Sequence, residues 1–249
     1  MPEPCREILG VRVDCTNYPA ATREILEWAK TGRSRYVCCA CVHSVMEAHD
    51  SKEYRTVIRS AHLVTADGMP VVWLLRRLGF PSASRVYGPD LMINVLEAAT
   101  KASIPVGFYG ASEVVLRQLL RRVAARFPAL DIVFAEAPPF RLPTPAEDEK
   151  TTRAINQSGA RILFIGLGTP KQDRWMHAHL GRVTAVMLGV GAAFDFLARA
   201  KPQAPRWMQA SGLEWLFRFA WEPRRLWRRY LLHNPRFAIL AISQLLRQR

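Results

Sequence analysis

Short apolar segments alternate with longer amphipathic segments along most of this 249-residue sequence. Runs rich in Val, Ile, Leu and Phe, typical of buried strands, occupy residues 36–42, 62–66, 104–109, 131–135, 161–166 and 183–190. Stretches with the periodicity of helices occupy residues 19–31, 43–60, 69–79, 90–102, 112–127, 145–158 and 170–180. This alternation predicts an α/β fold in which a mostly parallel sheet carries helices on both faces.

The alternation ends near Gln203, and the sequence beyond it is helical in pattern, basic and rich in tryptophan. We therefore expect an α/β body, residues 1–203, and a C-terminal appendage, residues 204–249. From Arg199 onward, eleven Lys/Arg residues stand against two Glu residues, so +9 of the formal net charge of +14 lies in this part. Such a concentration of positive charge indicates an anionic partner: nucleic acid, a membrane surface or a phosphorylated ligand.

The sequence has five cysteines and no apolar segment near its start that resembles a signal peptide. Cys38 and Cys41 form a C-x-x-C pair, but they lie in the run YVCCACV, which is typical of a buried strand. No second ligand pair has the spacing of a zinc site. We therefore expect reduced thiols, a cytoplasmic protein and no metal or other cofactor. No apolar run reaches the ~18–20 residues that a membrane-spanning helix needs.

Four strand-to-helix turns carry residues suited to ligand binding. Ligands of open parallel sheets bind beyond the carboxyl ends of the strands, so these turns should gather at one edge. Their glycines and polar residues are Asp67, Gly110, Gly166, Gly168, Thr169, Gln172, Gly191 and Asp195. Two carboxylates beside a helix start that suits phosphate indicate a nucleotide or nucleotide-sugar site. On spacing alone, Asp67 is better explained as the N-cap of the helix that begins near Pro70.

The turn IGLGTPKQDRWM (165–176) indicates phosphate binding. Thr169 can cap the following helix and Pro170 fits its first position, which leaves free backbone N–H groups that attract anions. Lys171 stands where the fingerprint G-x-G-x-x-G has its third glycine, which argues against a nicotinamide-dependent oxidoreductase. The sequence also lacks a D-x-D pair of the kind that holds a divalent ion for a sugar nucleotide.

The segment EPRRLWRRYLL (222–232) has the sharpest pattern of the appendage. At ~100° per residue, one helix face holds the arginines and the opposite face holds the large apolar residues. The first set is Arg224, Arg225, Arg228 and Arg229, and the second is Leu226, Trp227, Tyr230 and Leu231. Such a helix can lie in a membrane interface, and a docked surface helix with a solvated basic face explains the pattern equally well. Arginine rather than lysine favours phosphate, which it binds bidentately.

The ordered motifs TADGMPVVW, VYGPDLM, GFYGAS, IGLGTPKQDRWM, GVGAAFDFLA and GLEWLFRFAWEPRRLWRRY resemble the WecG/TagA/CpsF family of bacterial glycosyltransferases. The resemblance runs from about residue 8 to residue 232. It implies a Rossmann-like body, a helical appendage and a metal-independent, inverting reaction. Family members move a sugar from a UDP-sugar to a polyprenyl-diphosphate-linked acceptor at the cytoplasmic membrane face, in cell-surface polysaccharide synthesis. The sugar is N-acetylmannosamine, its uronic acid or glucose.

The resemblance also implies roles for individual residues. Asp67 matches the proposed general base, Gln172 the glutamine of a P-K-Q motif, and Asp195 an aspartate of the nucleotide-sugar pocket. The other donor-pocket positions are Gly110, Gly166, Gly168, Thr169 and Gly191. The arginines that grip the acceptor diphosphate fall among Arg218, Arg225 and Arg228. The same acceptor- and membrane-binding segment includes Arg224, Arg229 and Trp227.

Four positions depart from the family pattern. The active-site end of one strand reads Cys39-Ala40-Cys41 where the family often has Thr-x-Asn, so an amide contact is lost at Cys41. Arg199 replaces a glycine at the edge of the donor pocket, and Asp173 replaces a glutamate.

Two other functions follow from fold class and charge: an NAD-type oxidoreductase and a basic nucleic-acid-binding protein. A nucleic-acid-binding protein would bind bulk DNA or RNA with steep salt dependence, whereas the transferase would bind liposomes. We expect the UDP-sugar, the lipid-linked acceptor and an anionic membrane as partners, no nucleic acid, and a possible homo-oligomer.

Overall fold

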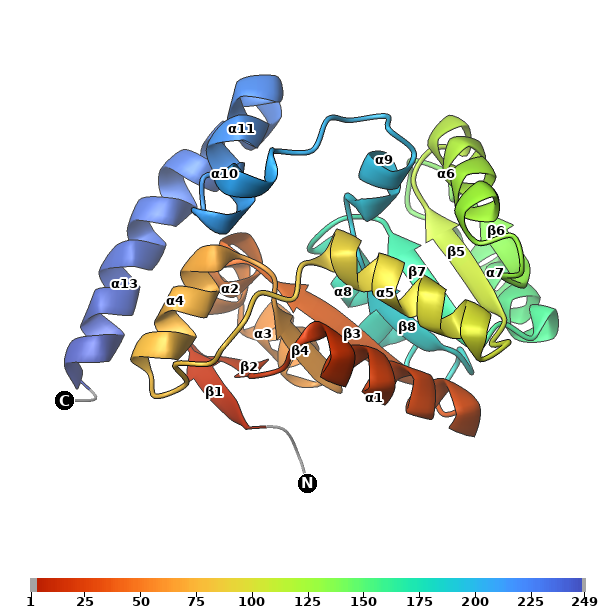
Figure 1. The fold of residues 1–249 in the computed structure, drawn as a ribbon, viewed down its shortest axis with the longest axis horizontal. Helices are drawn as coiled ribbons and strands as arrows, with labels where there is room; N and C mark the ends of the chain where they lie inside the picture. Colours follow the sequence, from red (N-terminus) through yellow and green to blue (C-terminus); the bar gives the residue numbers. More distant parts are fainter. Residues whose placement is uncertain (1–3, 248–249) are drawn as a thin grey trace.

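The computed structural model describes residues 4–247 and has the α/β fold that the sequence predicts (Figure 1). Its central sheet has six parallel strands in the order β4-β3-β8-β7-β5-β6. They are β3 (Arg35–Ala40), β4 (Leu63–Ala66), β5 (Val106–Gly110), β6 (Ile132–Glu136), β7 (Ile162–Gly166) and β8 (Val186–Gly189). Each strand overlaps one predicted run, because strands covered on both faces are apolar almost throughout.

Helices pack on both faces of the sheet, because parallel strands need crossover connections. One face contacts α1 (Tyr18–Thr31), α5 (Gly88–Lys101), α6 (Glu113–Arg126) and α9 (Ala193–Leu197). The other contacts α2 (Val42–Asp50), α3 (Lys52–Arg59), α4 (Met69–Arg77), α7 (Pro145–Ser158) and α8 (Lys171–Ala178). Figure 1 shows α1 and α5 in front of the sheet.

The single helix predicted for residues 43–60 is two helices that meet at Ser51. Ser51 ends α2, and its hydroxyl accepts a hydrogen bond of 3.2 Å from the backbone N–H of Tyr54, which caps α3. Serine is favoured at this position because its side chain satisfies a free N–H group of the first turn.

A β-hairpin that the sequence analysis missed precedes α1. Its strands are β1 (Cys5–Ile8) and β2 (Val11–Asp14), and Leu9 and Gly10 between them both have positive φ. The side chains of Ile8, Val11 and Val13 are buried against the body. The Asp14 carboxylate fixes the hairpin to the sheet, because it accepts a hydrogen bond of 2.8 Å from the backbone N–H of Val64.

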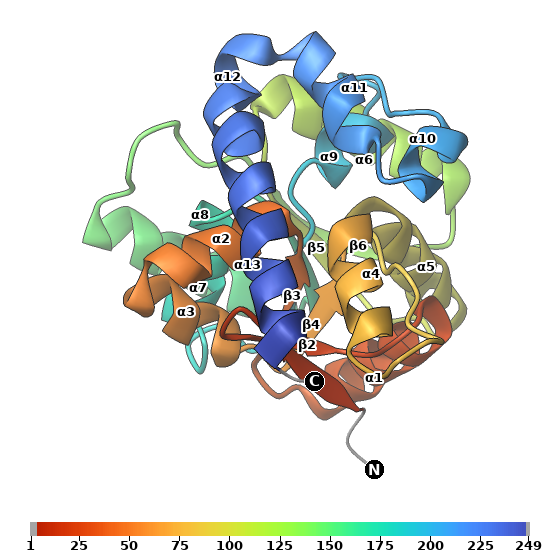
Figure 2. The same ribbon diagram turned by 90° about the vertical axis from the view of Figure 1, so that its left-hand side faces the viewer.

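The appendage is a chain of helices. They are α10 (Arg206–Ala210), α11 (Glu214–Trp221), α12 (Pro223–Trp227), the π-helical segment η1 (Arg228–Leu232) and α13 (His233–Arg247). Both views place α13 beside α4 and α2, outside strand β4 (Figures 1 and 2). Phe237 and Ala241 of α13 join the core of the body. Within residues 4–247, no helix is long and apolar enough to cross a membrane.

The predicted division of residues 222–232 into an arginine face and an apolar face is partly wrong. Leu226 and Tyr230 are buried, but Trp227 and Leu231 are 45% and 53% exposed. Arg229 turns toward the body instead of joining the exposed arginines. At ~100° per residue, Leu226 and Tyr230 lie about 40° apart on the helix surface, whereas Trp227 and Arg229 each lie roughly 60–100° from them. The buried stripe is therefore narrower than the predicted apolar face, and Arg229 flanks it.

Candidate active site

The carboxyl ends of β4, β3, β8 and β7 adjoin at one edge of the sheet, and they bring the predicted turns together. A Cβ built on Gly68 would lie 3.5 Å from Cα of Cys41, so the turns after β4 and β3 are in contact. A Cβ on Gly88 would lie 3.5 Å from the carbonyl oxygen of Val190 and 3.6 Å from Sγ of Cys39. The start of α5 therefore closes the edge next to the turn that contains Gly191.

Asp67 lies at this edge and does not cap α4. The N-cap of α4 is Gly68, and no side chain caps that helix. The Asp67 carboxylate instead accepts a hydrogen bond of 2.8 Å from the backbone N–H of Gly88. Burial raises the pKa of Asp67 to about 6, with Arg85 acting in the lowering direction and Glu214 in the raising direction. A carboxylate with a pKa close to neutral is suited to general-base catalysis.

Arg85, Tyr87 and Glu214 form a network around Asp67 that the sequence analysis missed. Arg85 Nε donates to the carbonyl oxygen of Asp67, and Arg85 Nη2 donates to Glu214 Oε2 at 2.6 Å. The Tyr87 hydroxyl donates to Glu214 Oε1 at 2.9 Å. Because Glu214 begins α11, this network ties the appendage to the edge that contains Asp67. The available signal was the VYGPDLM motif, which contains Tyr87 and directly follows Arg85.

A cavity of about 550 Å³ opens between this edge and the appendage. Asp67, Arg85, Glu214, Arg218 and Arg229 are among its lining residues. Much of the remaining lining is apolar and comes from α4, α11 and α13. A mainly apolar cavity with a few convergent polar groups is typical of a ligand site.

Of the five appendage arginines predicted to bind the acceptor or the membrane, two face this cavity and three do not. Arg218 and Arg229 line it, and Arg229 Nη2 lies 3.3 Å from Sγ of Cys41. Arg224, Arg225 and Arg228 are exposed on the outer side. Arg225 pairs with Glu222, and the guanidinium of Arg228 lies 5.2 Å from the Trp227 ring centroid.

The turn after β7 differs from its predicted capping. The N-cap of α8 is Pro170, the helix starts at Lys171, and no side chain caps it, so Thr169 is not the N-cap. The Thr169–Pro170 peptide bond is cis. Gln172 is 3% exposed, and its Oε1 accepts a hydrogen bond of 3.1 Å from the backbone N–H of Gly168. The buried amide thus shapes the loop that contains it.

Asp173 lies in the interior beneath this turn. It is 2% exposed, and the Tyr54 hydroxyl donates to it at 2.7 Å. Burial raises the pKa of Asp173 to about 6, although hydrogen bonds from Tyr54, Cys38 and Thr169 act in the lowering direction.

Two of the predicted donor-site glycines are needed for close packing. A Cβ on Gly110, whose φ is +135°, would lie 2.6 Å from the backbone of Gly166. A Cβ on Gly166 would lie 2.5 Å from the ring of Phe194. Gly168 has free space around it. Asp195 lies on α9, where its carboxylate is 3.7 Å from Lys201 Nζ.

Within residues 4–247, one group of three possible metal ligands lies close together: His43, Glu47 and His233. Asp67 does not belong to this group. Burial lowers the pKa of His43 to about 3, and the positive charges of Arg229 and His233 act in the same direction. The same positive surroundings oppose the binding of a cation.

Comparison with known proteins assigns the chain to a family. The profile of the Glycosyl transferase WecG/TagA/CpsF family matches residues 6–249. The chain belongs to this family. It is 30% identical over 198 residues to a Bacillus spizizenii protein named N-acetylglucosaminyldiphosphoundecaprenol N-acetyl-beta-D-mannosaminyltransferase. The alignment covers 79% of this chain and 74% of the relative.

Membership makes the protein a glycosyltransferase. The structure shows what surrounds Cys39 and Cys41, the two positions of β3 and its end that depart from the family pattern. Cys41 is the N-cap of α2, and its Sγ lies against Arg229 of the appendage. Cys39 Sγ lies against the start of α5. Burial raises the pKa of the Cys39 thiol well above its usual range, so this side chain stays neutral beside Asp67.

We expect transferase kcat/KM to fall about tenfold per pH unit below a midpoint near pH 6, because a general base must be ionised and the pKa of Asp67 is raised to about 6. Glu214 acts to raise that pKa, so Glu214→Gln should move the midpoint to lower pH. The measurement is a pH series of kcat/KM for both proteins. Glu27→Gln, on the exposed side of α1, is the matched control and should keep the original midpoint. An unchanged midpoint in Glu214→Gln would contradict the assignment of the titration to Asp67.

Proposed function

We propose that this glycosyltransferase moves a hexose from a UDP-sugar to a polyprenyl-diphosphate-linked acceptor in cell-surface polysaccharide synthesis, with inversion and without a metal ion. One observation carries the proposal: Asp67, whose pKa is raised to about 6, faces a mainly apolar cavity together with Arg218 and Arg229. This combination suits an acceptor with a reacting hydroxyl, a diphosphate and a lipid. The name of the Bacillus spizizenii relative supports N-acetylmannosamine as the sugar and an N-acetylglucosaminyl-diphosphate lipid as the acceptor.

In the proposed reaction, the ionised Asp67 carboxylate accepts the proton of the acceptor hydroxyl. The hydroxyl oxygen attacks the anomeric carbon from the side opposite UDP, and the bond between that carbon and the UDP oxygen breaks. The configuration inverts because one displacement occurs. The proton remains on Asp67 until solvent removes it, and UDP leaves with the bonding electron pair.

The donor lies, in this proposal, beside the turn at Gly168 and Thr169. A Cβ built on Gly191 would lie 4.0 Å from Cα of Gly168, so this turn adjoins the turn after β8, which itself contacts the start of α5. The predicted contacts of Gln172, Gly191 and Asp195 with the donor belong to the same proposal. Gln172 acts there by holding the loop, because its amide is buried and bonded to Gly168.

Arg218 and Arg229 hold the acceptor diphosphate in this proposal. Both line the cavity with Asp67, and the guanidinium group binds phosphate oxygens bidentately. This assignment changes the predicted set, since Arg225 and Arg228 are exposed on the outer side.

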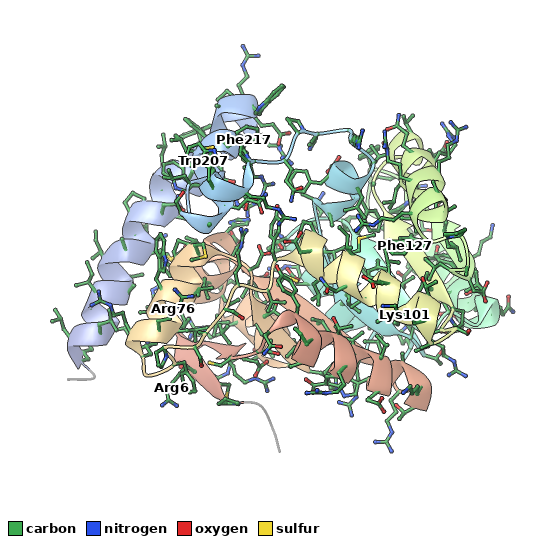
Figure 3. All side chains as sticks on the ribbon, in the orientation of Figure 1. Arg6, Arg76, Lys101, Phe127, Trp207 and Phe217 are labelled. Carbon is green, nitrogen blue, oxygen red and sulfur yellow. The ribbon has the colours of Figure 1, made fainter. Side chains whose placement is uncertain are left out.

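The exposed arginines suit an anionic membrane surface at the cytoplasmic face. Arg224, Arg225 and Arg228 lie in the same part of the appendage as exposed apolar side chains, which include Trp207, Trp221, Leu231 and Leu232. Figure 3 shows Trp207 and Phe217 together at the end of the molecule formed by α10 and α11. Apolar side chains flanked by arginines are typical of proteins that bind in the interface of a bilayer.

Asp67→Asn should lower turnover by roughly 10²–10⁴-fold, the usual effect of losing a general base. Binding of the UDP-sugar should change little, since Asp67 acts on the acceptor. The assay combines calorimetry against a set of UDP-sugars with product analysis on an N-acetylglucosaminyl-diphosphate lipid. Asp131→Asn, at an exposed site before β6, is the matched control. Near-normal turnover in Asp67→Asn would rule out the base assignment, and no transfer from any UDP-sugar would rule out the donor class.

Activity should persist in excess EDTA, because arginines can stabilise the charge of the leaving diphosphate in place of a metal ion. The measurement is turnover before and after chelation, followed by addition of magnesium or manganese. Loss of activity that either ion restores would contradict the metal-independent mechanism.

Replacing Arg224, Arg225 and Arg228 together by Glu should weaken binding to anionic vesicles by about 1 kcal/mol or more per charge changed. The loss should shrink at high salt, because salt screens surface charge. Co-sedimentation with phosphatidylglycerol vesicles measures it. The control is a second triple variant with the same charge change on α6, which lies far from the appendage in Figure 1. It replaces three exposed arginines, Arg117, Arg121 and Arg122, by Glu. Equal losses in the two triple variants would mean that net charge, not the appendage, determines binding.

A further inference from the structure

The cavity beside Asp67 has an apolar section that the sugar transfer itself does not use. This section lies between α4 and α13, where its walls include Trp73, Leu74, Phe237, Ala241 and Leu245. It is continuous with the part lined by Asp67, Arg218 and Arg229, because all these residues line one cavity.

The section is elongated along α13. The lining residues of that helix run from Asn234 to Leu245, which at the rise of an α-helix corresponds to roughly 17 Å. Ala238 and Ala241 leave space because their side chains are small. The α4 side contributes Met69 near Asp67 and Arg77 at the far end.

The polar groups of the cavity are unevenly placed. Asp67, Arg85, Glu214, Arg218 and Arg229 belong to the catalytic edge or to the helices that dock on it. Along α13, by contrast, Asn234 is the one polar lining residue, and on the α4 side Arg77 is an exposed residue at the far end. An apolar channel that begins at two arginines is complementary to a molecule with an anionic head and an apolar chain.

We propose that the section between α4 and α13 binds the first isoprene units of the lipid carrier, next to its diphosphate. This inference rests on the proposed function, since it assumes a polyprenyl-diphosphate acceptor. The prenyl chain enters beside Arg218 and Arg229 and lies along α13 toward Leu245. Ile242 is part of the wall and is also 59% exposed, so the channel opens along the outer side of α13. The remaining chain leaves there toward the bilayer.

The proposal predicts a dependence of KM on prenyl chain length. The acceptors are N-acetylglucosaminyl diphosphates that carry one, two, three or four isoprene units, assayed in one detergent-free buffer. Each of the first units should lower KM by about three- to tenfold, because buried apolar groups leave water, and the effect should level off once the channel is full. The kcat should stay constant, because the chain is remote from the reacting atoms and binds ground and transition state equally.

Ala238→Trp fills the channel from its solvent side and should abolish the dependence on chain length. In this variant, the KM for the four-unit acceptor should rise to the KM for the one-unit acceptor. The KM for the one-unit acceptor should itself stay within about twofold of its value in the native protein. Ala238→Leu should give an intermediate effect. Ile239→Trp is the matched control, because Ile239 is 68% exposed and does not line the cavity. Thermal unfolding of the three variants checks that each is folded.

The outcomes separate this inference from the proposed function. Transfer to all four acceptors with equal KM overturns the lipid channel and leaves the proposed function intact. Equal losses for short and long acceptors in a folded Ala238→Trp also overturn the channel. No transfer to any acceptor from any UDP-sugar overturns the proposed function itself.

Discussion

The ion pair between Arg85 and Glu214 joins the helices of the appendage to the sheet edge that contains Asp67. Arg85 donates to the Asp67 carbonyl on one side and to Glu214 of α11 on the other, and both side chains of the pair are less than one-fifth exposed, at 16% and 13%. Breaking such a pair by removing one partner leaves an uncompensated charge in a poorly solvated place. The cavity therefore depends on this contact, since its walls come from both the body and the appendage.

The same pair links docking of the appendage to the acidity of Asp67. Arg85 acts to lower the pKa of Asp67, whereas Glu214, which arrives with the appendage, acts to raise it. A body without its appendage would keep Arg85 beside Asp67 and would lose Glu214. Its aspartate would then be more acidic and a weaker base. Docking of the appendage thus brings Arg218 and Arg229 into the cavity and also raises the pKa of Asp67 through Glu214.

Local sequence patterns predicted the parts of the fold that depend on local chemistry. All six central strands were found, because each is an apolar run between turn residues. The hairpin before α1 was missed because charged residues interrupt both of its strands, CREI and VRVD, so neither is a continuous apolar run. Asp67 and its edge were predicted from strand-end position and family resemblance. Arg85 and Glu214 were not, because they are 129 positions apart and only tertiary packing brings them together. Arg229 was placed with the exposed arginines because the pattern of residues 222–232 does not show that only a narrow stripe around Leu226 and Tyr230 packs on the body.

The hydrogen bonds of Gln244 have a consequence for synthesis of the protein. Its side chain accepts from the backbone N–H of Leu9 at 3.0 Å and donates to the carbonyl oxygen of Glu7 at 2.7 Å. These contacts join residues 235 and 237 positions apart. A chain emerging from the ribosome forms its N-terminal hairpin early, since N-terminal parts fold first. That hairpin must wait for nearly all of the described sequence to be translated before α13 can pack on it. A nascent chain can therefore form its sheet well before α13 is available to wall the cavity.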